Sequence, residues 1–213
     1  MSGILDLLSN DLGKTIINGV SQETNQPQNK TQDVLTMALP VLMTAMKRNA
    51  SSQEGAQGLL SALDNKHDGS ILDNLSGLFG GGVDHAVKTD GEKILGHVLG
   101  KKQTMVETAL SEKSGVDANS VAQILKIAAP IVLGMLGKEK KQQNINHQSG
   151  LENLLGGLLS GNSRQQEQSF LESVLDADGD GSVIDDVAGM VLGGNKKKGG
   201  LGGLLGGLFG NNK

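Results

Sequence analysis

The sequence repeats itself, and this repetition limits the folds open to the chain more than any other feature. Residues 60–82 (LSALDNKHDGSILDNLSGLFGGG) align without gaps on residues 172–194 (ESVLDADGDGSVIDDVAGMVLGG). Upstream, residues 33–46 (DVLTMALPVLMTAM) align on residues 123–136 (QILKIAAPIVLGML). The offset is 112 for the first pair and 90 for the second, so the second copy holds about 22 additional residues. Self-similarity of this kind predicts a tandem duplication of one structural unit.

Apolar residues recur at helical spacing in both copies, over residues 34–46 and again over residues 121–136. Such i, i+3, i+4, i+7 stripes are typical of helices with one buried face. Pro40 and Pro130 stand in the middle of these stripes, at aligned positions. A proline inside a helix removes one hydrogen bond and costs about 3 kcal/mol. We therefore expect both helices to kink or break at their prolines.

Other segments also favour helices. Apolar residues between Leu5 and Val20 predict an N-terminal helix, and residues 104–107 (TMVE) resemble a capping box that opens another, which Gly115 would close. Asp117 or Asn119 would cap the next helix. No segment shows the alternation expected of strands. The predicted fold class is all-α: a multihelical bundle built from two homologous tandem repeats, with a flexible Gly/Leu-rich C-terminal tail.

The predicted organisation has three parts. Residues 1–89 form the first helical repeat, residues 90–195 form the second repeat with an Asp-rich loop, and residues 196–213 form the tail. The tail (KKKGGLGGLLGGLFGNNK) holds too many glycines for a stable isolated helix. One interpretation is a flexible, weakly adhesive terminus. The other is a self-association or membrane-surface segment, with Leu and Phe side chains as anchors and Lys196–Lys198 facing anionic lipid.

The Asp-rich loop of the second repeat is the candidate binding site. Its acids alternate at loop positions 1, 3 and 5, Gly181 follows at position 6, and this spacing resembles the first half of an EF-hand loop that binds Ca²⁺. Position 12 holds Val187 instead of the usual Glu, so an acid one or two residues earlier must close the site. Five Asp within eleven residues also repel one another unless a cation is present. The predicted ligands are Asp176, Asp178, Asp180, Ser182 (through its carbonyl), Asp185 and Asp186.

The first copy of this segment allows an interpretation without metal. It keeps acids at Asp64 and Asp68 but has Lys66 where the second copy has Asp178. An ammonium there would repel a divalent ion or take its place. Residues 70–73 (SILD) resemble a capping box, so the shared residues are also explained by a turn and a helix start. We expect Ca²⁺ in the second copy and not in the first.

Composition excludes several classes of function. The chain has 213 residues, a net charge of −4 and no Cys, which rules out disulfides, thiolate metal sites and Cys nucleophiles. Net acidity, with no aromatic residues among the Lys clusters, argues against nucleic-acid binding. His85 and His97 flank two acids, but their spacing matches no ligand pattern, and we expect capping or solvent-facing roles. No catalytic motif is present, so we expect no enzymatic activity.

The N-terminal sequence lacks the features of a secretory signal. The longest stretch without polar side chains, residues 127–137, is shorter than the roughly 20 residues that span a bilayer. We therefore expect a cytoplasmic protein without an integral membrane segment. Association with a surface or the cell envelope through the tail stays open.

Residues 90–138, followed by residues 175–194 and a Gly/Leu tail, resemble bacterial domain-of-unknown-function family 937, which is related to the YidB-like proteins. The resemblance covers most of the chain. It implies an all-helical bacterial protein without an established activity, and it supplies no catalytic residue. The family's recurrent acidic segment matches the Asp-rich loop of the second repeat, whereas Ca²⁺ binding there is inferred from spacing alone.

Two functions follow from these features. The first is a non-enzymatic bacterial helical protein that binds Ca²⁺ through residues 176–186 as a structural staple. The alternative is an oligomerising or envelope-associated assembly protein that acts through its Leu/Gly-rich segments. The partner of the protein would be a divalent cation in the first case. In the second case it would be another copy of the chain or an envelope surface.

Overall fold

A computed structural model describes residues 5–160, which belong to one unit of the chain, Met1–Ala177. Over that range the chain forms helices and contains no strand, so the prediction of an all-α multihelical fold is confirmed. The Asp-rich loop and the tail lie outside the described residues. The helices are α1 (Asp6–Ser9), α2 (Asp11–Thr24), α3 (Gln28–Ala50), α4 (Gln53–Asn65), α5 (Ser70–Asp73), α6 (Leu75–Gly80), α7 (His85–Leu99), the 3₁₀ turn η1 (Gly100–Lys102), α8 (Gln103–Ser114), α9 (Ala118–Gln142) and α10 (Gln148–Ser160).

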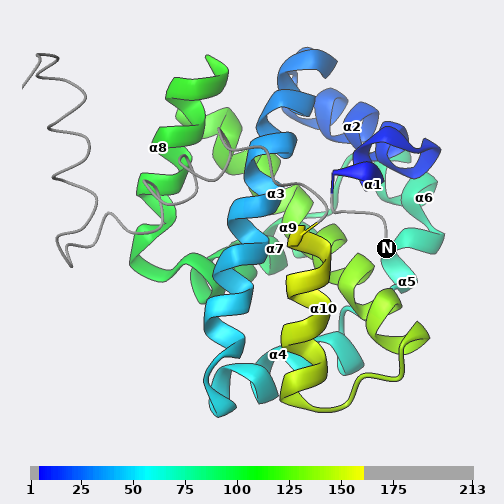
Figure 1. Cartoon of the computed structure of the whole chain (residues 1–213). Coiled ribbons are helices and arrows are strands. Elements are labelled where there is room, and N and C mark those ends of the chain that lie inside the picture. The colour runs from blue at the N-terminus through cyan, green and yellow to red at the C-terminus, as the bar shows by residue number, and fades with distance from the viewer. Residues whose placement is uncertain (1–4, 161–213) are drawn as a thin grey trace, which may run out of the picture. The chain divides into compact units, whose positions relative to one another are not determined.

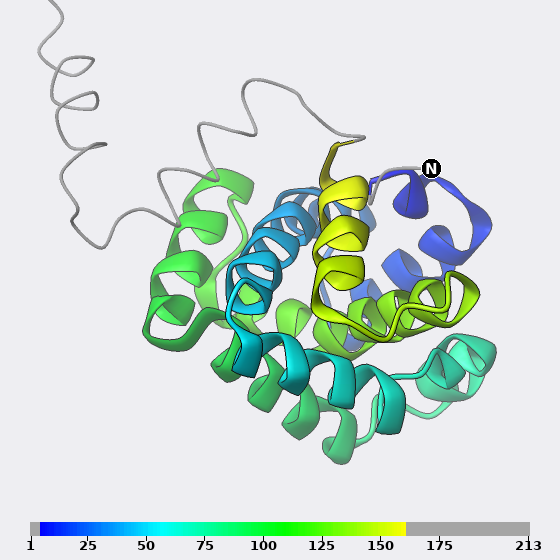
Figure 2. The same ribbon diagram turned by 60° about the horizontal axis from the view of Figure 1, so that its bottom comes forward.

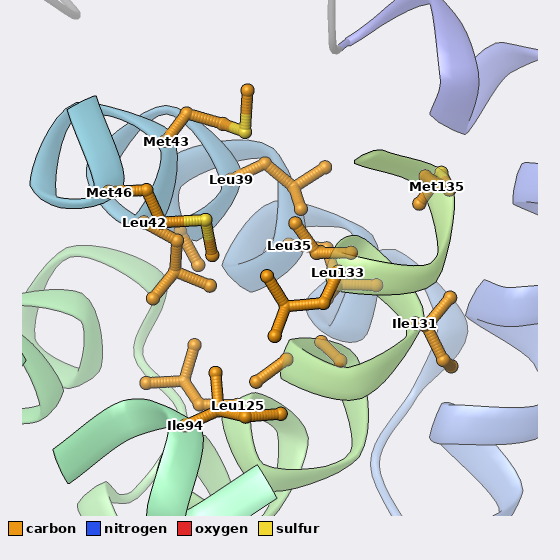
Figure 3. Packing of buried hydrophobic residues seen from close by; sticks show 14 of the residues in the cluster. Leu35, Leu39, Leu42, Met43, Met46, Ile94, Leu125, Ile131, Leu133 and Met135 are labelled. Carbon is orange, nitrogen blue, oxygen red and sulfur yellow. The ribbon is translucent and has the colours of Figure 1, made fainter. Parts of the chain in front are cut away.

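Helices α3 and α9 occupy the centre of this arrangement (Figure 1). Both α2 and α8 pack against α3 as well as α9, while α7 packs along α9 and α10 along α3. Figure 3 shows aliphatic and methionine side chains of α3, α7 and α9 meeting in the interior, among them Met46, Ile94 and Leu133. Buried apolar residues of all the longer helices form a single core cluster. The core is aliphatic because the chain has only three aromatic residues, all Phe.

Of the two outcomes expected at the prolines, a kink or a break, the break does not occur. Helix α3 continues through Pro40 and α9 through Pro130, and both prolines are buried. Packing on all sides offsets the missing hydrogen bond. Pro130 has no N–H to donate to the carbonyl of Lys126, and this carbonyl faces Gly91 of α7, where an added Cβ would lie 1.7 Å from the oxygen. A Cα–H contact from glycine is a weak substitute partner for such a carbonyl.

The α2–α3 and α8–α9 connections share one design. In each, a serine Oγ donates 2.6 Å to the carbonyl oxygen five residues later, and a residue with positive φ ends the first helix. Corresponding positions are separated by 90 residues, the offset that aligns the two prolines. The pairs are Ser21 and Ser111, Asn25 and Gly115, Gln26 and Val116, and the helix starts Gln28 and Ala118.

Some of the helix ends agree with the predictions from the sequence and others do not. Gly115 ends α8 with a φ of 69°, and the Asp117 carboxylate caps α9 by accepting from the Ser120 N–H at 2.9 Å, both as predicted. The capping box at residues 104–107 is absent, because η1 leads directly into α8 at Gln103 and no side chain caps that helix. The N-terminal helix is divided in two at Asn10, whose side chain caps α2 instead.

Helix α9 is long and apolar enough to cross a membrane by length and composition alone. Its most apolar window has a mean hydropathy of 1.7, but 78% of that window is buried within the fold. A position in the core explains both the hydropathy and the burial, because a helix at the centre of a bundle is apolar on all sides.

Substituting Gly91 by Ala should destabilise the fold, because the new Cβ would clash with the Lys126 carbonyl. Overpacking of this kind costs about 1–3 kcal/mol. Gly96 on the same helix is the matched control: nothing lies within 4 Å of its Cβ position. Gly96→Ala should therefore stabilise by up to about 1 kcal/mol through helix propensity. Urea unfolding measures both changes, and equal effects of the two substitutions would contradict the close approach of α7 to α9.

Candidate functional site

The first copy of the acidic segment forms a tight turn between α4 and α5. The Asp68 carboxylate accepts from the Ser70 backbone N–H at 3.1 Å, and Gly69 has a φ of 105°, which favours glycine. Ser70 itself makes no capping hydrogen bond, so the expected capping box at residues 70–73 is absent. The turn therefore depends on Asp68 and Gly69.

Lysines at the end of α9 neutralise this turn. Lys140 Nζ lies 2.5 Å from an Asp64 carboxylate oxygen, and Lys141 Nζ lies 2.6 Å from one of Asp68. The hydrogen bond from Lys141, with that from the Ser70 amide, holds the pKa of Asp68 well below its usual range. Lys66 does not take the place of a cation in the turn, because it pairs with Asp90 of α7 instead. The positive charges at the turn therefore come from α9.

Glycines of α9 let the turn approach closely. A Cβ at Gly137 would lie 1.9 Å from the His67 carbonyl oxygen, and one at Gly134 would lie 2.5 Å from the Ile71 side chain. The backbone of the turn therefore packs directly on α9. This contact positions Lys140, whose side chain is only 7% exposed, to reach Asp64.

No group of three or more His, Asp or Glu side chains within residues 5–160 is arranged to hold a metal ion. The predicted ligands of the second copy, from Asp176 to Asp186, lie outside the described residues. The structure therefore bears on the first copy alone, where the acids contact lysines.

A groove of about 800 Å³ is lined in part by His67 and is bordered by α4, α7 and the end of α3. Figure 2 brings α4 and α7 to the front of the view. Pockets of 300–1,000 Å³ are the size that takes small ligands. The apolar part of the lining consists of Met46, Leu59, Ala62, Ile94, Val98 and Leu133, and the charged part consists of Arg48, Glu54, Lys66, Asp90 and Lys93.

His67 is the most unusual residue of this groove, because its side chain is only 7% exposed. Its Nε2 lies 3.5 Å from an Asp90 carboxylate oxygen, too far for a good hydrogen bond. Burial lowers the pKa of His67, although the Asp90 charge opposes that change. The imidazole is therefore held in its neutral form near pH 7.

The remaining histidines act locally. His85 Nδ1 lies 3.2 Å from the Thr89 hydroxyl, and His97 Nδ1 lies 2.7 Å from the Lys93 carbonyl oxygen, one turn earlier on the same helix. His147 accepts from the Gly150 N–H at 3.0 Å, at the start of α10.

A family model matches this chain over residues 6–139 and 141–213, and its description is "Bacterial protein of unknown function (DUF937)". The chain belongs to this family. The family resemblance seen in the sequence is therefore confirmed. Searches of the curated proteins and of the solved structures each found no match.

Sequence reasoning on this DUF937 protein missed His67 and its groove. His67 stands between charged residues in a turn, where a solvent-facing side chain is the normal expectation. Its burial arises from contact with α7 and α9, which begin about 18 and 51 residues later in the chain. Asp90, which approaches it, carries no distinguishing pattern in the sequence.

We predict that His67 titrates below 6.5, its ordinary pKa, because burial disfavours the protonated ring. An unfolded chain would then bind a proton near pH 6 that the folded chain does not. This contribution to stability is complete above pH 6.5 and is lost as the pH falls towards the folded pKa. Proton NMR of the His67 imidazole over a pH titration measures this pKa.

Urea unfolding at pH 7.5 and pH 5.5 should show a smaller pH dependence for His67→Gln than for the parent. A His67 imidazole that titrates at or above 6.5 would contradict its burial.

Proposed function

We propose that this DUF937 protein is a non-enzymatic helical protein whose second acidic segment, residues 176–186, binds Ca²⁺ as a structural staple. The proposal includes two homologous repeats, residues 1–89 and 90–195. The observation that supports it most is the contact of both acids in the first turn, Asp64 and Asp68, with lysines of α9.

The second copy has no equivalent lysines. At the offset of 90 that relates α3 to α9, Lys140 and Lys141 correspond to Ala50 and Ser51, which are uncharged. The glycines that admit the first turn, Gly134 and Gly137, correspond to Thr44 and Lys47, which carry side chains. A second turn packed against α3 in the same way would therefore lack both the charges and the space that the first one uses.

The second segment also needs more positive charge than the first. It has Asp178 where the first has Lys66, and Asp186 where the first has an uncharged Asn74. Hard carboxylate oxygens at alternate positions are the ligands that Ca²⁺ prefers. A divalent cation is the simplest replacement for the missing lysines. The carbonyl of Ser182, with Asp185 or Asp186, would complete the set.

The absence of enzymatic activity is part of the same proposal. A His beside an Asp is a partial catalytic constellation, but nucleophilic catalysis also needs a nucleophile bonded to the base. Within residues 5–160 no hydroxyl group forms a hydrogen bond with His67. This supports a binding role for the groove.

Thermal unfolding of the full chain tests the Ca²⁺ proposal. A ligand that binds only the folded state at 100 times its Kd stabilises by about 2.7 kcal/mol, which raises the Tm by about 5–10 °C in a chain of this size. We expect this increase on replacing EDTA with millimolar Ca²⁺, and a smaller one with Mg²⁺.

Asp68→Ala and Asp180→Ala form a matched pair, because they occupy the same position in the two copies. Asp68→Ala should keep the full Ca²⁺-dependent increase in Tm, whereas Asp180→Ala and Asp178→Ala should lose it. No change in Tm with either ion would reject the site and leave the second segment as a turn and helix cap.

We propose as the second candidate that the tail drives self-association or binding to an anionic surface of an otherwise cytoplasmic protein. The tail places Leu201, Leu204, Leu205, Leu208 and Phe209 beside Lys196–Lys198, a combination that suits anionic lipid. Deleting residues 196–213 should then lower the sedimentation coefficient or abolish co-sedimentation with vesicles containing phosphatidylglycerol. Identical behaviour of both chains in both assays would reject this function.

A further inference from the structure

We propose that the groove between α4 and α7 binds a small anionic amphiphile, an aliphatic carboxylate whose chain lies on the apolar floor. This site is distinct from the acidic segments, and it does not depend on Ca²⁺. Its evidence comes from four features of the described residues: an apolar floor, a buried imidazole that makes no side-chain hydrogen bond, a lysine without an ion pair and a glycine that keeps the groove open.

The floor is part of the hydrophobic core. Met46 of α3, Ile94 of α7 and Leu133 of α9 all line the groove, although each is at most 8% exposed. Leu59 of α4 and Val98 of α7 are half-buried and add to its walls. An alkyl chain placed here would replace water on apolar atoms. Each buried methylene raises affinity by about fourfold.

His67 supplies a polar group to the groove. More than nine-tenths of its side chain is buried, it lines the groove, and it makes no hydrogen bond with any residue from 5 to 160. The Asp90 carboxylate oxygen, 3.5 Å from Nε2, is too far for a good hydrogen bond, so the ring can still donate to a ligand in the groove. A neutral imidazole has one N–H donor, and a carboxylate oxygen is an acceptor that fits it.

The charges of the lining favour an anion. They comprise Arg48, Lys66 and Lys93 against Glu54 and Asp90, with His67 neutral. Asp90 is already paired with Lys66. The Lys93 ammonium forms no ion pair with the described part of the chain. It is therefore available to a ligand carboxylate.

Gly58 keeps the groove open. It lies in the middle of α4, lines the groove, and has nothing within 4 Å of its Cβ position. Packing therefore does not require a glycine here, and a glycine inside a helix weakens that helix. A longer side chain at this position would extend into the space that the ligand occupies.

The chain's own Leu/Gly tail fits the groove less well than a carboxylate does. Residues 201–209 (LGGLLGGLF) contain no acidic side chain to accept from His67 or to pair with Lys93. Their side chains could only pack on the apolar floor. A free aliphatic carboxylate can pack its chain on the floor, accept from the His67 imidazole and pair with the Lys93 ammonium.

Isothermal titration calorimetry with the full chain and decanoate, in EDTA and below the micellar concentration, tests the proposal. We expect saturable binding of one decanoate per chain. Decanol and decyltrimethylammonium should bind at least tenfold more weakly, because neither offers an anionic acceptor. Because no Ca²⁺ is present, failure of the Ca²⁺ site does not affect this result.

Gly58→Leu should reduce decanoate affinity at least tenfold by filling the groove. Gly96→Leu is the matched control, because Gly96 also has open space at its Cβ position but does not line the groove. The decanoate affinity of this variant should stay within twofold of that of the parent. Lys93→Gln should weaken decanoate binding about tenfold and leave decanol binding unchanged. Circular dichroism establishes that each variant is folded.

Three results would overturn the proposal. The first is the absence of saturable decanoate binding at millimolar concentration. The second is an equal loss of decanoate binding in Gly58→Leu and Gly96→Leu. Normal decanoate binding by Gly58→Leu, Gly96→Leu and Lys93→Gln alike would count in the same way. The third is an NMR change at residues 201–209 in the ligand-free Gly58→Leu chain, which would show that the tail occupies the groove.

Discussion

The close approach of other backbones to α9 is the constraint on which the described fold depends. Pro130 leaves the Lys126 carbonyl without its usual donor, and Gly91 of α7 lies directly against it. About two turns after Pro130, Gly137 admits the backbone of the acidic turn at His67. Side chains at either glycine would separate these elements. The groove, the buried histidine and the lysine contacts all follow from these two approaches.

The acidic turn illustrates how one sequence pattern has more than one electrostatic solution. Its carboxylates must be neutralised because they are crowded, and in the first copy Lys140 and Lys141 do this. These lysines are distant in sequence and reach the turn only because α9 packs beneath it. The second copy has more acids, and the positions that correspond to these lysines are uncharged. The comparison makes a bound cation a specific expectation for the second copy.

The groove places unlike groups together: core side chains, a buried imidazole and the Lys93 ammonium, which forms no ion pair within residues 5–160. Within residues 5–160 the His67 side chain makes no hydrogen bond, and its nearby charge is the Asp90 carboxylate at 3.5 Å. The proposals for the groove and for the Ca²⁺ site rest on different residues, so each stands or fails independently.

The sequence determined the all-α class, the two central helices and several of their ends, because periodicity and capping at Asp117 and Gly115 are local properties. It did not determine that α3 and α9 continue through their prolines, since burial on every side supplies the energy that offsets the break. Nor did it determine the burial of His67 or the lysine partners of Asp64 and Asp68. Those depend on contacts between segments up to 76 residues apart, and only the packing of the helices decides such contacts.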